Sequence, residues 1–305
     1  MRLPLLFGLS FALVSTASAQ VPPVMNKRAI APSTNELRGI QVALSDQGTN
    51  FTLFLPHGWT NAVSSNSTLC VHFHGAPWFV IQEHVRRGAK EPLAVFALGE
   101  GSSTYRAPFE DTNRFARVLA IIESELQKRD AKKARITAVD VSSFSAGYGA
   151  VRELVKVPYS FQIIRRIVLL DSMYGGLEPQ RNGNTNRVPL SEHIDVWVPF
   201  AQAGMRSEKT FVLAHSQVPT SSYASTAECA AALLARLGLK TQPVATNSIP
   251  ASDPDFPLQA RASRNGLHIW SYAGTDAQAH MTHARHLADV WQALNEMAVQ
   301  SASRN

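Results

Sequence analysis

One stretch decides the fold of this chain: Ala138-Val139-Asp140-Val141-Ser142-Ser143-Phe144-Ser145-Ala146-Gly147-Tyr148-Gly149-Ala150. It lies within an apolar, β-branched run that begins at Ile136, and it leads into residues 150–155, whose pattern predicts a helix. A strand, a sharp turn and a helix with a serine at the tip form a nucleophile elbow. We therefore predict that Ser145 follows a buried strand, with its hydroxyl exposed above the sheet as a candidate nucleophile.

The residues around the tip agree with this prediction. An elbow needs small residues two positions before and two positions after its serine, and here these are Ser143 and Gly147. The usual pattern has Gly at both positions, so Ser143 departs from it but is still small. The helix that follows favours negative charge near its N-terminus. The alternative interpretation is a strand-to-helix turn of small residues without a chemical role.

The first residues predict export. A basic start, an apolar run over residues 3–14 and an Ala-x-Ala end at residues 17–19 form a secretory signal peptide, with cleavage after Ala19. The run is too short to span a bilayer and no later stretch is long enough, so we expect no transmembrane segment. The prediction is a secreted or periplasmic protein, with a signal peptide over 1–19, an extended tail over 20–35 and a single domain over 36–305.

Charge argues against a nucleic-acid partner. The formal net charge is +6, but the basic residues are scattered, and the one dense cluster, residues 128–135, has no interleaved aromatic residues. We interpret this cluster as a solvated connection between a helix and a strand. The two cysteines, Cys70 and Cys229, fall in elements that the expected sheet order places far apart, so we predict two buried free thiols.

Alternating strands and helices predict an α/β fold. Residues 40–44 and 51–55 alternate polar and apolar side chains around a turn, which predicts an antiparallel hairpin. Later strands are continuous apolar runs, typical of parallel strands buried on both faces. We expect a doubly wound, mostly parallel sheet with that antiparallel N-terminal hairpin. Residues 99–104 and 243–266 are expected to be irregular, and residues 172–209 to form a small cap or lid insertion. Further strands are predicted at 68–73, 93–98, 136–141, 166–170, 210–214 and 267–272, and helices at 79–87, 115–126, 150–155, 194–202, 224–237 and around 287–294.

Functional residues in open α/β sheets lie at the carboxyl ends of the strands. In this chain those ends carry His74, Ser145, Asp171 and His215, and His280 follows the last strand. A serine, then an acid, then a histidine is the chain order of the triad in α/β-hydrolases.

The chain resembles the α/β-hydrolase superfamily from about Ile40 to Val299. The resemblance is carried by the His74-Gly75 turn after an early strand, by Ser-x-Ser-x-Gly at residues 143–147 and by the histidine beyond the last strand. It implies a serine hydrolase that cleaves a carboxylic ester or a related acyl bond, free or polymer-linked, through an acyl-enzyme and without a cofactor or metal. The sequence does not specify the substrate, and an amide, a thioester or an envelope glycan ester stays open beside a simple ester.

The resemblance also implies catalytic roles. Ser145 would attack the acyl carbon, and His280, at the start of the final helix, would take its proton. His283 is the alternative base. His283 and His286 point progressively away from the loop, and we interpret them as surface or helix-packing residues.

The acid that orients the histidine has three candidates. Asp171 is favoured because it ends the strand directly after the elbow strand. Family members commonly place the acid one strand later, where residues 215–217 offer no carboxylate. Glu228 and Asp276 are the alternatives, and Asp171 would then be a cap for the following turn.

An oxyanion hole requires preorganised N–H donors. The residue after the nucleophile, Ala146, supplies one, and the resemblance implies that Ala76 supplies the other, because Pro77 has no N–H.

The candidate substrate-binding residues are His74, Trp78 and Tyr174. His74 would brace its loop, and Trp78 would line an acyl pocket unless it packs in the core. Two other functions compete. His72 and His74 share a face if both lie on a strand, as the ligands of a metal hydrolase often do. A binding module that kept the fold and lost its activity is the third interpretation.

Overall fold

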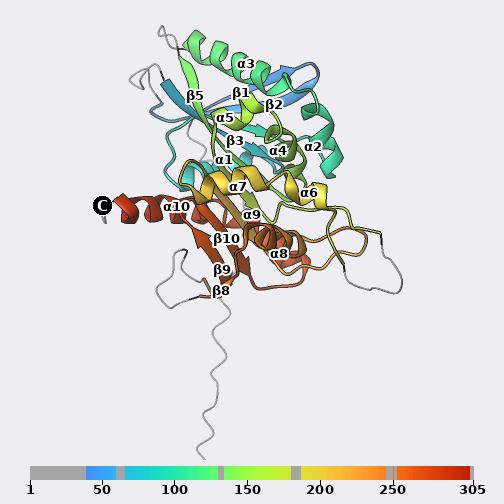
Figure 1. Ribbon diagram of the computed structural model, residues 1–305. Helices are drawn as coiled ribbons and strands as arrows, with labels where there is room; N and C mark the ends of the chain where they lie inside the picture. The colour runs from blue at the N-terminus through green and yellow to red at the C-terminus, as the bar shows by residue number, and fades with distance from the viewer. Residues whose placement is uncertain are drawn as a thin grey trace, which may run out of the picture. The chain divides into compact units, whose positions relative to one another are not determined.

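The strands form one sheet of ten, in the order β1-β2-β4-β3-β5-β6-β7-β10-β9-β8 (Figure 1). The computed structural model describes residues 39–59, 66–129, 134–179, 187–244, 250 and 253–302, which belong to one compact unit. The six strands from β4 to β10 in this order are parallel, and the strands outside them pair antiparallel with their neighbours. The strands are β1 (Gly39–Asp46), β2 (Thr49–Pro56), β3 (Asn66–Phe73), β4 (Leu93–Phe96), β5 (Arg135–Phe144), β6 (Ile164–Leu170), β7 (Thr210–His215), β8 (Gln242–Pro243), β9 (Leu258–Arg264) and β10 (Leu267–Tyr272).

Helices cover both faces of the sheet, which confirms the predicted doubly wound, mostly parallel architecture. Successive strand residues point to opposite faces; in β3, Leu69 and Val71 join one core cluster and Cys70 joins the other. The first cluster packs under α2, α3, α4, α7 and α8, and the second under α1, α9 and α10. The helices are α1 (Pro77–Arg86), α2 (Ser102–Phe109), α3 (Arg114–Arg129), α4 (Tyr148–Leu154), α5 (Pro158–Ile163), α6 (Ser191–Asp195), α7 (Val198–Met205), α8 (Thr226–Leu237), α9 (Ala277–Arg285), α10 (Leu287–Ala302) and the 3₁₀ turn η1 (Ser145–Gly147).

The N-terminal hairpin is present as predicted. β1 and β2 pair antiparallel, and Asp46 faces Thr49 across a two-residue turn. Both turn residues, Gln47 and Gly48, have positive φ, 46° and 79°. A two-residue turn with positive φ at both positions matches the right-handed twist of paired strands, which is why Gly is favoured there.

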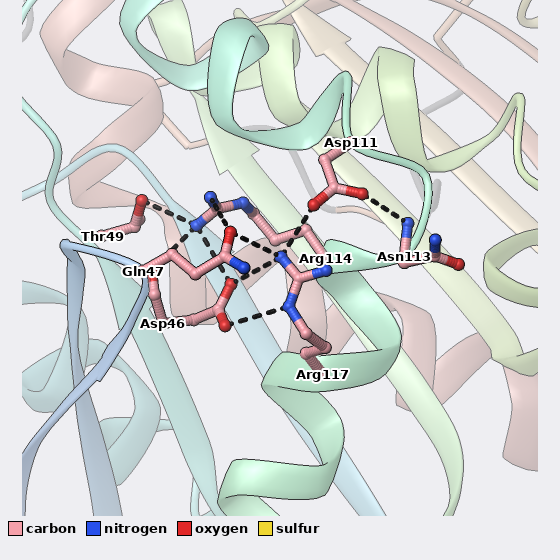
Figure 2. A network of polar contacts seen from close by, with 7 residues as sticks. All are labelled: Asp46, Gln47, Thr49, Asp111, Asn113, Arg114 and Arg117. Atoms are coloured by element: carbon pink, nitrogen blue, oxygen red, sulfur yellow. Dashed lines mark hydrogen bonds and ion pairs between the residues drawn. The ribbon is translucent and has the colours of Figure 1, made fainter.

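A polar network attaches this hairpin to α3 (Figure 2). Buried Asp46 pairs with the guanidinium groups of Arg114 and Arg117, both at 3.1 Å. Arg114 also donates to the Thr49 hydroxyl at 2.8 Å, and Arg117 pairs with Asp111 at 2.8 Å. Removing one partner of a buried ion pair leaves an uncompensated charge. The network therefore makes Asp46 a determinant of how the edge of the sheet meets α3.

Two segments differ from the sequence-based predictions. Residues 99–104 were expected to form a loop, but α2 begins at Ser102 and contributes Tyr105 and Phe109 to the core. The segment 243–266 was expected to be irregular, but it contains β9, which pairs antiparallel with β10. Only two of the seven β9 residues are buried, so its sequence lacks the apolar alternation that reveals a strand.

The predicted cap insertion contains α6 and α7. α7 contacts β7 and β10 and so covers the sheet as the crossover helix between β6 and β7, whereas α6 contacts α8. A cap function for this insertion stays a prediction. Cys70 and Cys229 are buried and free, as predicted. The predicted signal peptide and tail lie outside the described residues. Among the described residues, no helix has both the length and the apolar character needed to cross a membrane.

Candidate active site

The elbow turn is strained in the way that the sequence predicts. β5 ends at Phe144, and Ser145 follows with φ 47°, in the left-handed region that side chains rarely adopt. A Cβ on Gly147 would lie 2.2 Å from the carbonyl oxygen of Phe73, at the end of the neighbouring strand β3. Only Gly allows this close approach. Such strain persists only where the surrounding structure holds it, and it is concentrated at functional sites.

Hydrogen bonds explain why Ser143 stands at the position where nucleophile elbows usually have Gly. The hydroxyl of Ser143 contacts that of Ser172 at 2.8 Å, and the Ser172 hydroxyl donates to the carbonyl oxygen of Ser145 at 2.8 Å. Ser143 and Ser172 are both fully buried. This chain of hydroxyl groups links the ends of β5 and β6 and stabilises the strained backbone at Ser145 through its carbonyl oxygen.

Three residues with positive φ lie at the carboxyl ends of three adjacent parallel strands. His74 follows β3 with φ 72°, Ser145 follows β5 with φ 47°, and Asp171 follows β6 with φ 42°. The order β3-β5-β6 makes these strands neighbours, so the three residues stand side by side at one edge of the sheet. This edge is where ligands bind in open α/β sheets.

Asp171 and His280 meet at this edge, although they are far apart in the sequence. The distance between Oδ2 of Asp171 and Nδ1 of His280 is 2.7 Å. The carboxylate is completely buried and also accepts the backbone N–H of Ser216 at 3.2 Å, the Ser216 hydroxyl at 2.7 Å and the Thr226 hydroxyl. Burial alone would raise the pKa of Asp171, but the hydrogen bonds from His280, Thr226 and Ser216 outweigh it and hold that pKa well below its usual range.

The hydrogen bond to Asp171 decides the tautomer of His280. A carboxylate only accepts, so Nδ1 carries the proton and Nε2 remains as the basic nitrogen. The imidazole ring stacks on Phe144, with centroids 4.6 Å apart. Because Phe144 directly precedes Ser145, this contact holds the ring beside the elbow. His280 is 22% exposed at its side chain, which leaves part of the ring accessible.

The sheet order, the strained elbow after β5 and the histidine beyond β10 decide the fold. The described residues adopt an α/β-hydrolase fold. Among solved structures, the chain is similar to a poly(3-hydroxybutyrate) depolymerase, LpqC, from Bordetella parapertussis, with 12% identity over 83% of this chain and 89% of that chain and a TM-score of 0.45. It is also similar to the feruloyl esterase module from Clostridium thermocellum (10% identity, 86% and 92% covered, TM-score 0.44) and to an S-formylglutathione hydrolase from Agrobacterium tumefaciens (9%, 84% and 95%, 0.45). Neither the protein-family profiles nor the curated proteins include a match.

The alternative acids have structural partners of their own. Glu228 completes a capping box with Ser225 at the start of α8 and pairs with Arg187 at 2.7 Å. Asp276 is the N-cap of α9 and accepts the backbone N–H of Ala279 at 2.8 Å. Only Asp171, of the three, bonds to His280.

The two other histidines of this helical region are buried packing residues. His283 is fully buried, and burial lowers the pKa of its imidazole to about 4. Its Nδ1–H donates to the carbonyl oxygen of Ala279 at 3.0 Å. His286 stacks on Phe256, with centroids 4.5 Å apart, and pairs with Asp289 at 2.6 Å. Both are therefore packing residues, which is one of the two interpretations that the sequence offered for them.

The premise of the metal alternative does not hold in the structure. His72 lies in β3, but His74 lies past its end with φ 72°, so the two rings do not share a strand face. Nε2 of His72 donates to the carbonyl oxygen of His74 at 3.0 Å, and Nδ1 accepts the Ser142 hydroxyl at 2.8 Å. Burial lowers the pKa of His72 to about 3, so the ring is neutral. The described ranges contain no group of three or more His, Cys, Asp or Glu side chains placed to hold a metal ion.

His74 braces its turn through a hydrogen bond, as the sequence analysis expects. Its Nδ1 bonds to the Tyr105 hydroxyl at 2.9 Å, and that hydroxyl accepts the backbone N–H of Leu98 at 3.1 Å. The imidazole also stacks on Phe144, with centroids 5.8 Å apart. Burial lowers the pKa of His74, and the neighbouring His280 lowers it further. The two imidazoles are thus joined through one phenyl ring at the elbow.

The candidate oxyanion donors lie at two helix starts. Ala146 is in η1 directly after Ser145, and Ala76 is the exposed N-cap of α1. Backbone N–H groups at the start of a helix have no partner within it and remain available to a ligand. Trp78 is half-buried in the first turn of α1, edge-on to Phe79, and Tyr174 is half-buried between two other tyrosines.

Sequence reasoning missed the hydroxyl donors around Asp171. Ser216 follows β7 and Thr226 begins α8, and only the folded chain brings both to the carboxylate. The signal for Ser216 was its place after a strand end. Thr226 had no such signal, since a hydroxyl at a helix start usually caps the helix.

Proposed function

We propose that this protein is an exported serine hydrolase that cleaves a carboxylic ester through a Ser145–His280–Asp171 triad and an acyl-enzyme. One observation carries the proposal: Asp171 and His280 are hydrogen-bonded at 2.7 Å at the sheet edge where Ser145 stands in a strained turn. A buried carboxylate bonded to an imidazole, beside an elbow serine, is the arrangement that nucleophilic acyl transfer requires.

The proposed reaction begins with proton transfer. Nε2 of His280 takes the proton of the Ser145 hydroxyl as Oγ forms a bond to the acyl carbon. Asp171 keeps Nδ1 protonated and stabilises the imidazolium that results. The negative charge on the former carbonyl oxygen is met by the N–H groups of Ala146 and Ala76.

The intermediate then collapses. The bond between the acyl carbon and the ester oxygen breaks, and the alcohol leaves with the proton from Nε2 of His280. Water, deprotonated by the same nitrogen, attacks the acyl-enzyme and releases the acid, and the proton returns to Ser145. Every proton moves between groups of this chain, substrate and water, so the proposal requires no cofactor.

The test removes the two reacting side chains. Ser145→Ala and His280→Ala should each lower kcat for a p-nitrophenyl ester by roughly 10⁴-fold or more, and the double variant should be hardly worse than either, because triad members act as a unit. Ser207 is a matched control, since it is an exposed serine with φ 65° in the turn after α7. Ser207→Ala should leave kcat unchanged. Undiminished hydrolysis by a folded Ser145→Ala protein would remove the proposal.

A further inference from the structure

Three tyrosines form a row beside the proposed triad. The ring centroids of Tyr148 and Tyr174 are 5.6 Å apart, and those of Tyr174 and Tyr223 are 5.5 Å apart. We call these residues the tyrosine row. Tyrosine combines a large apolar ring with a polar hydroxyl group, which makes it common at binding interfaces.

Each member of the row is tied closely to the proposed site. The first tyrosine follows Ser145 by three residues, the second follows Asp171 by three, and the third precedes Thr226 by three. The Thr226 hydroxyl donates to the Asp171 carboxylate. Three residues span at most about 10 Å of chain. All three rings are therefore held at the sheet edge that carries the proposed triad.

The outer end of the row is exposed but fixed. Tyr223 is 45% exposed, whereas Tyr148 is only 8% exposed. The backbone groups of Gly175 and Ala224 exchange two hydrogen bonds, 2.7 and 3.3 Å long, which join the segments that carry the second and third rings. The Arg187 guanidinium donates to the Tyr223 carbonyl oxygen at 2.6 Å and also forms an ion pair with Glu228 in the first turn of α8. An exposed ring that is already ordered loses little freedom on binding a ligand.

We propose that the tyrosine row binds a planar aromatic ring of the substrate, so that the hydrolase favours aromatic esters over saturated esters of the same size. The inference rests on the proposed function and names its substrate class. Aromatic pairs bind through offset-stacked or edge-to-face contacts, which a saturated ring does not make in the same way. The row is most exposed at Tyr223 and most buried at Tyr148, which is three residues from Ser145, so an aromatic ring bound on the row would lie near the elbow.

The experiment compares matched esters. Methyl 3-phenylpropanoate and methyl 3-cyclohexylpropanoate place the ring on the acyl side, and benzyl acetate and cyclohexylmethyl acetate place it on the alcohol side. In at least one pair, kcat/KM should be about two- to tenfold higher for the aromatic member. The pair with the larger ratio identifies the side of the ester that faces the row.

Two variants of matched exposure assign the preference to the row. Tyr223→Leu should bring the ratio of aromatic to saturated kcat/KM close to one. Tyr159 is 47% exposed and lies on α5, so Tyr159→Leu should leave both rates unchanged. A ratio near one in the wild-type protein, or a ratio that Tyr223→Leu does not change, would overturn the inference.

A binding measurement separates this inference from the proposed function. The Ser145→Ala protein should bind 3-phenylpropanoate several-fold more tightly than 3-cyclohexylpropanoate by calorimetry, and equal affinities would overturn the inference. Absence of Ser145-dependent hydrolysis of all four esters would instead refute the proposed function. The two failures are therefore distinguishable.

Discussion

Asp171→Asn tests the acid of the proposed triad more sharply than any other change. Oδ1 of Asp171 accepts the backbone N–H of Ser216, and Oδ2 accepts Nδ1–H of His280. An asparagine has one oxygen and one NH₂ group at these positions. The N–H of Ser216 cannot rotate away, so the oxygen must face it, and the NH₂ group must face His280. Nδ1 then has to accept, and the proton moves to Nε2.

That tautomer presents a donor, not a base, to Ser145. In other Ser-His-Asp triads the same substitution lowers kcat about 10⁴-fold with the geometry intact, and we expect a loss of that order here. KM should change little, because the lost interaction belongs to the transition state. The assay is the steady-state hydrolysis of a p-nitrophenyl ester at neutral pH, well below the melting temperature of each variant.

The other two carboxylates provide matched controls. Glu228→Gln weakens the α8 cap and the ion pair with Arg187, which should cost about 1 kcal/mol of stability and leave kcat within a few-fold. Asp276→Asn keeps a good N-cap residue for α9 and should change neither the stability nor kcat. The reasoning is refuted if folded Asp171→Asn keeps kcat within tenfold of the wild-type value, or if one of the two controls abolishes turnover instead.

The same variant has an expected pH dependence of stability. The pKa of Asp171 is held below its unfolded value of about 3.9, so the charged carboxylate stabilises the folded state above that pH, and this stabilisation is lost as pH falls below it. Wild type should therefore exceed Asp171→Asn in stability at neutral pH, and the difference should shrink in acid. Denaturant unfolding at pH 7 and pH 3 measures it.

The remaining predictions concern the elbow, the hairpin and export. Gly147→Ala places a Cβ 2.2 Å from the Phe73 carbonyl oxygen, so the turn must shift, and kcat should fall by about 10²-fold or more. Gly204→Ala is the control, because its Cβ would meet its nearest atom at 3.3 Å, and kcat should stay near the wild-type value. Asp46→Asn should lower the free energy of unfolding by about 2–3 kcal/mol, because two guanidinium groups lose their carboxylate, while exposed Asp111→Asn should cost within about 1 kcal/mol. Denaturant unfolding compares the two, and equal losses would contradict the network's role. Mass spectrometry of protein secreted by a suitable host should show residues 1–19 removed, and an intact Met1 would contradict export.

Local patterns were enough to predict the architecture. A buried β-branched run that ends in small residues allows few backbone conformations, so residues 136–155 alone were enough to predict the elbow at Ser145. The hairpin was equally predictable, because the alternation of polar and apolar residues and the Gln47-Gly48 turn are local features. The strand β9 was missed because an edge strand with little buried surface carries almost no periodic signal. Helix α2 was missed because its helical residues follow a glycine-rich start, and their burial depends on the sheet beneath them.

Local sequence patterns were sufficient to predict the doubly wound sheet and a short set of candidate residues at its carboxyl edge, because the apolar pattern of each strand indicates its burial independently of the other strands. The pairing of one acid with one histidine became visible in the folded chain alone. Asp171 and His280 are 109 residues apart, and although the sequence favoured Asp171, Glu228 and Asp276 stayed open as alternatives until their capping roles were known. The hydroxyl groups of Ser216 and Thr226 reach Asp171 only after β7 pairs with β6 and α8 packs against β7. A carboxylate's partners depend on contacts distant in sequence, and no local pattern encodes those contacts.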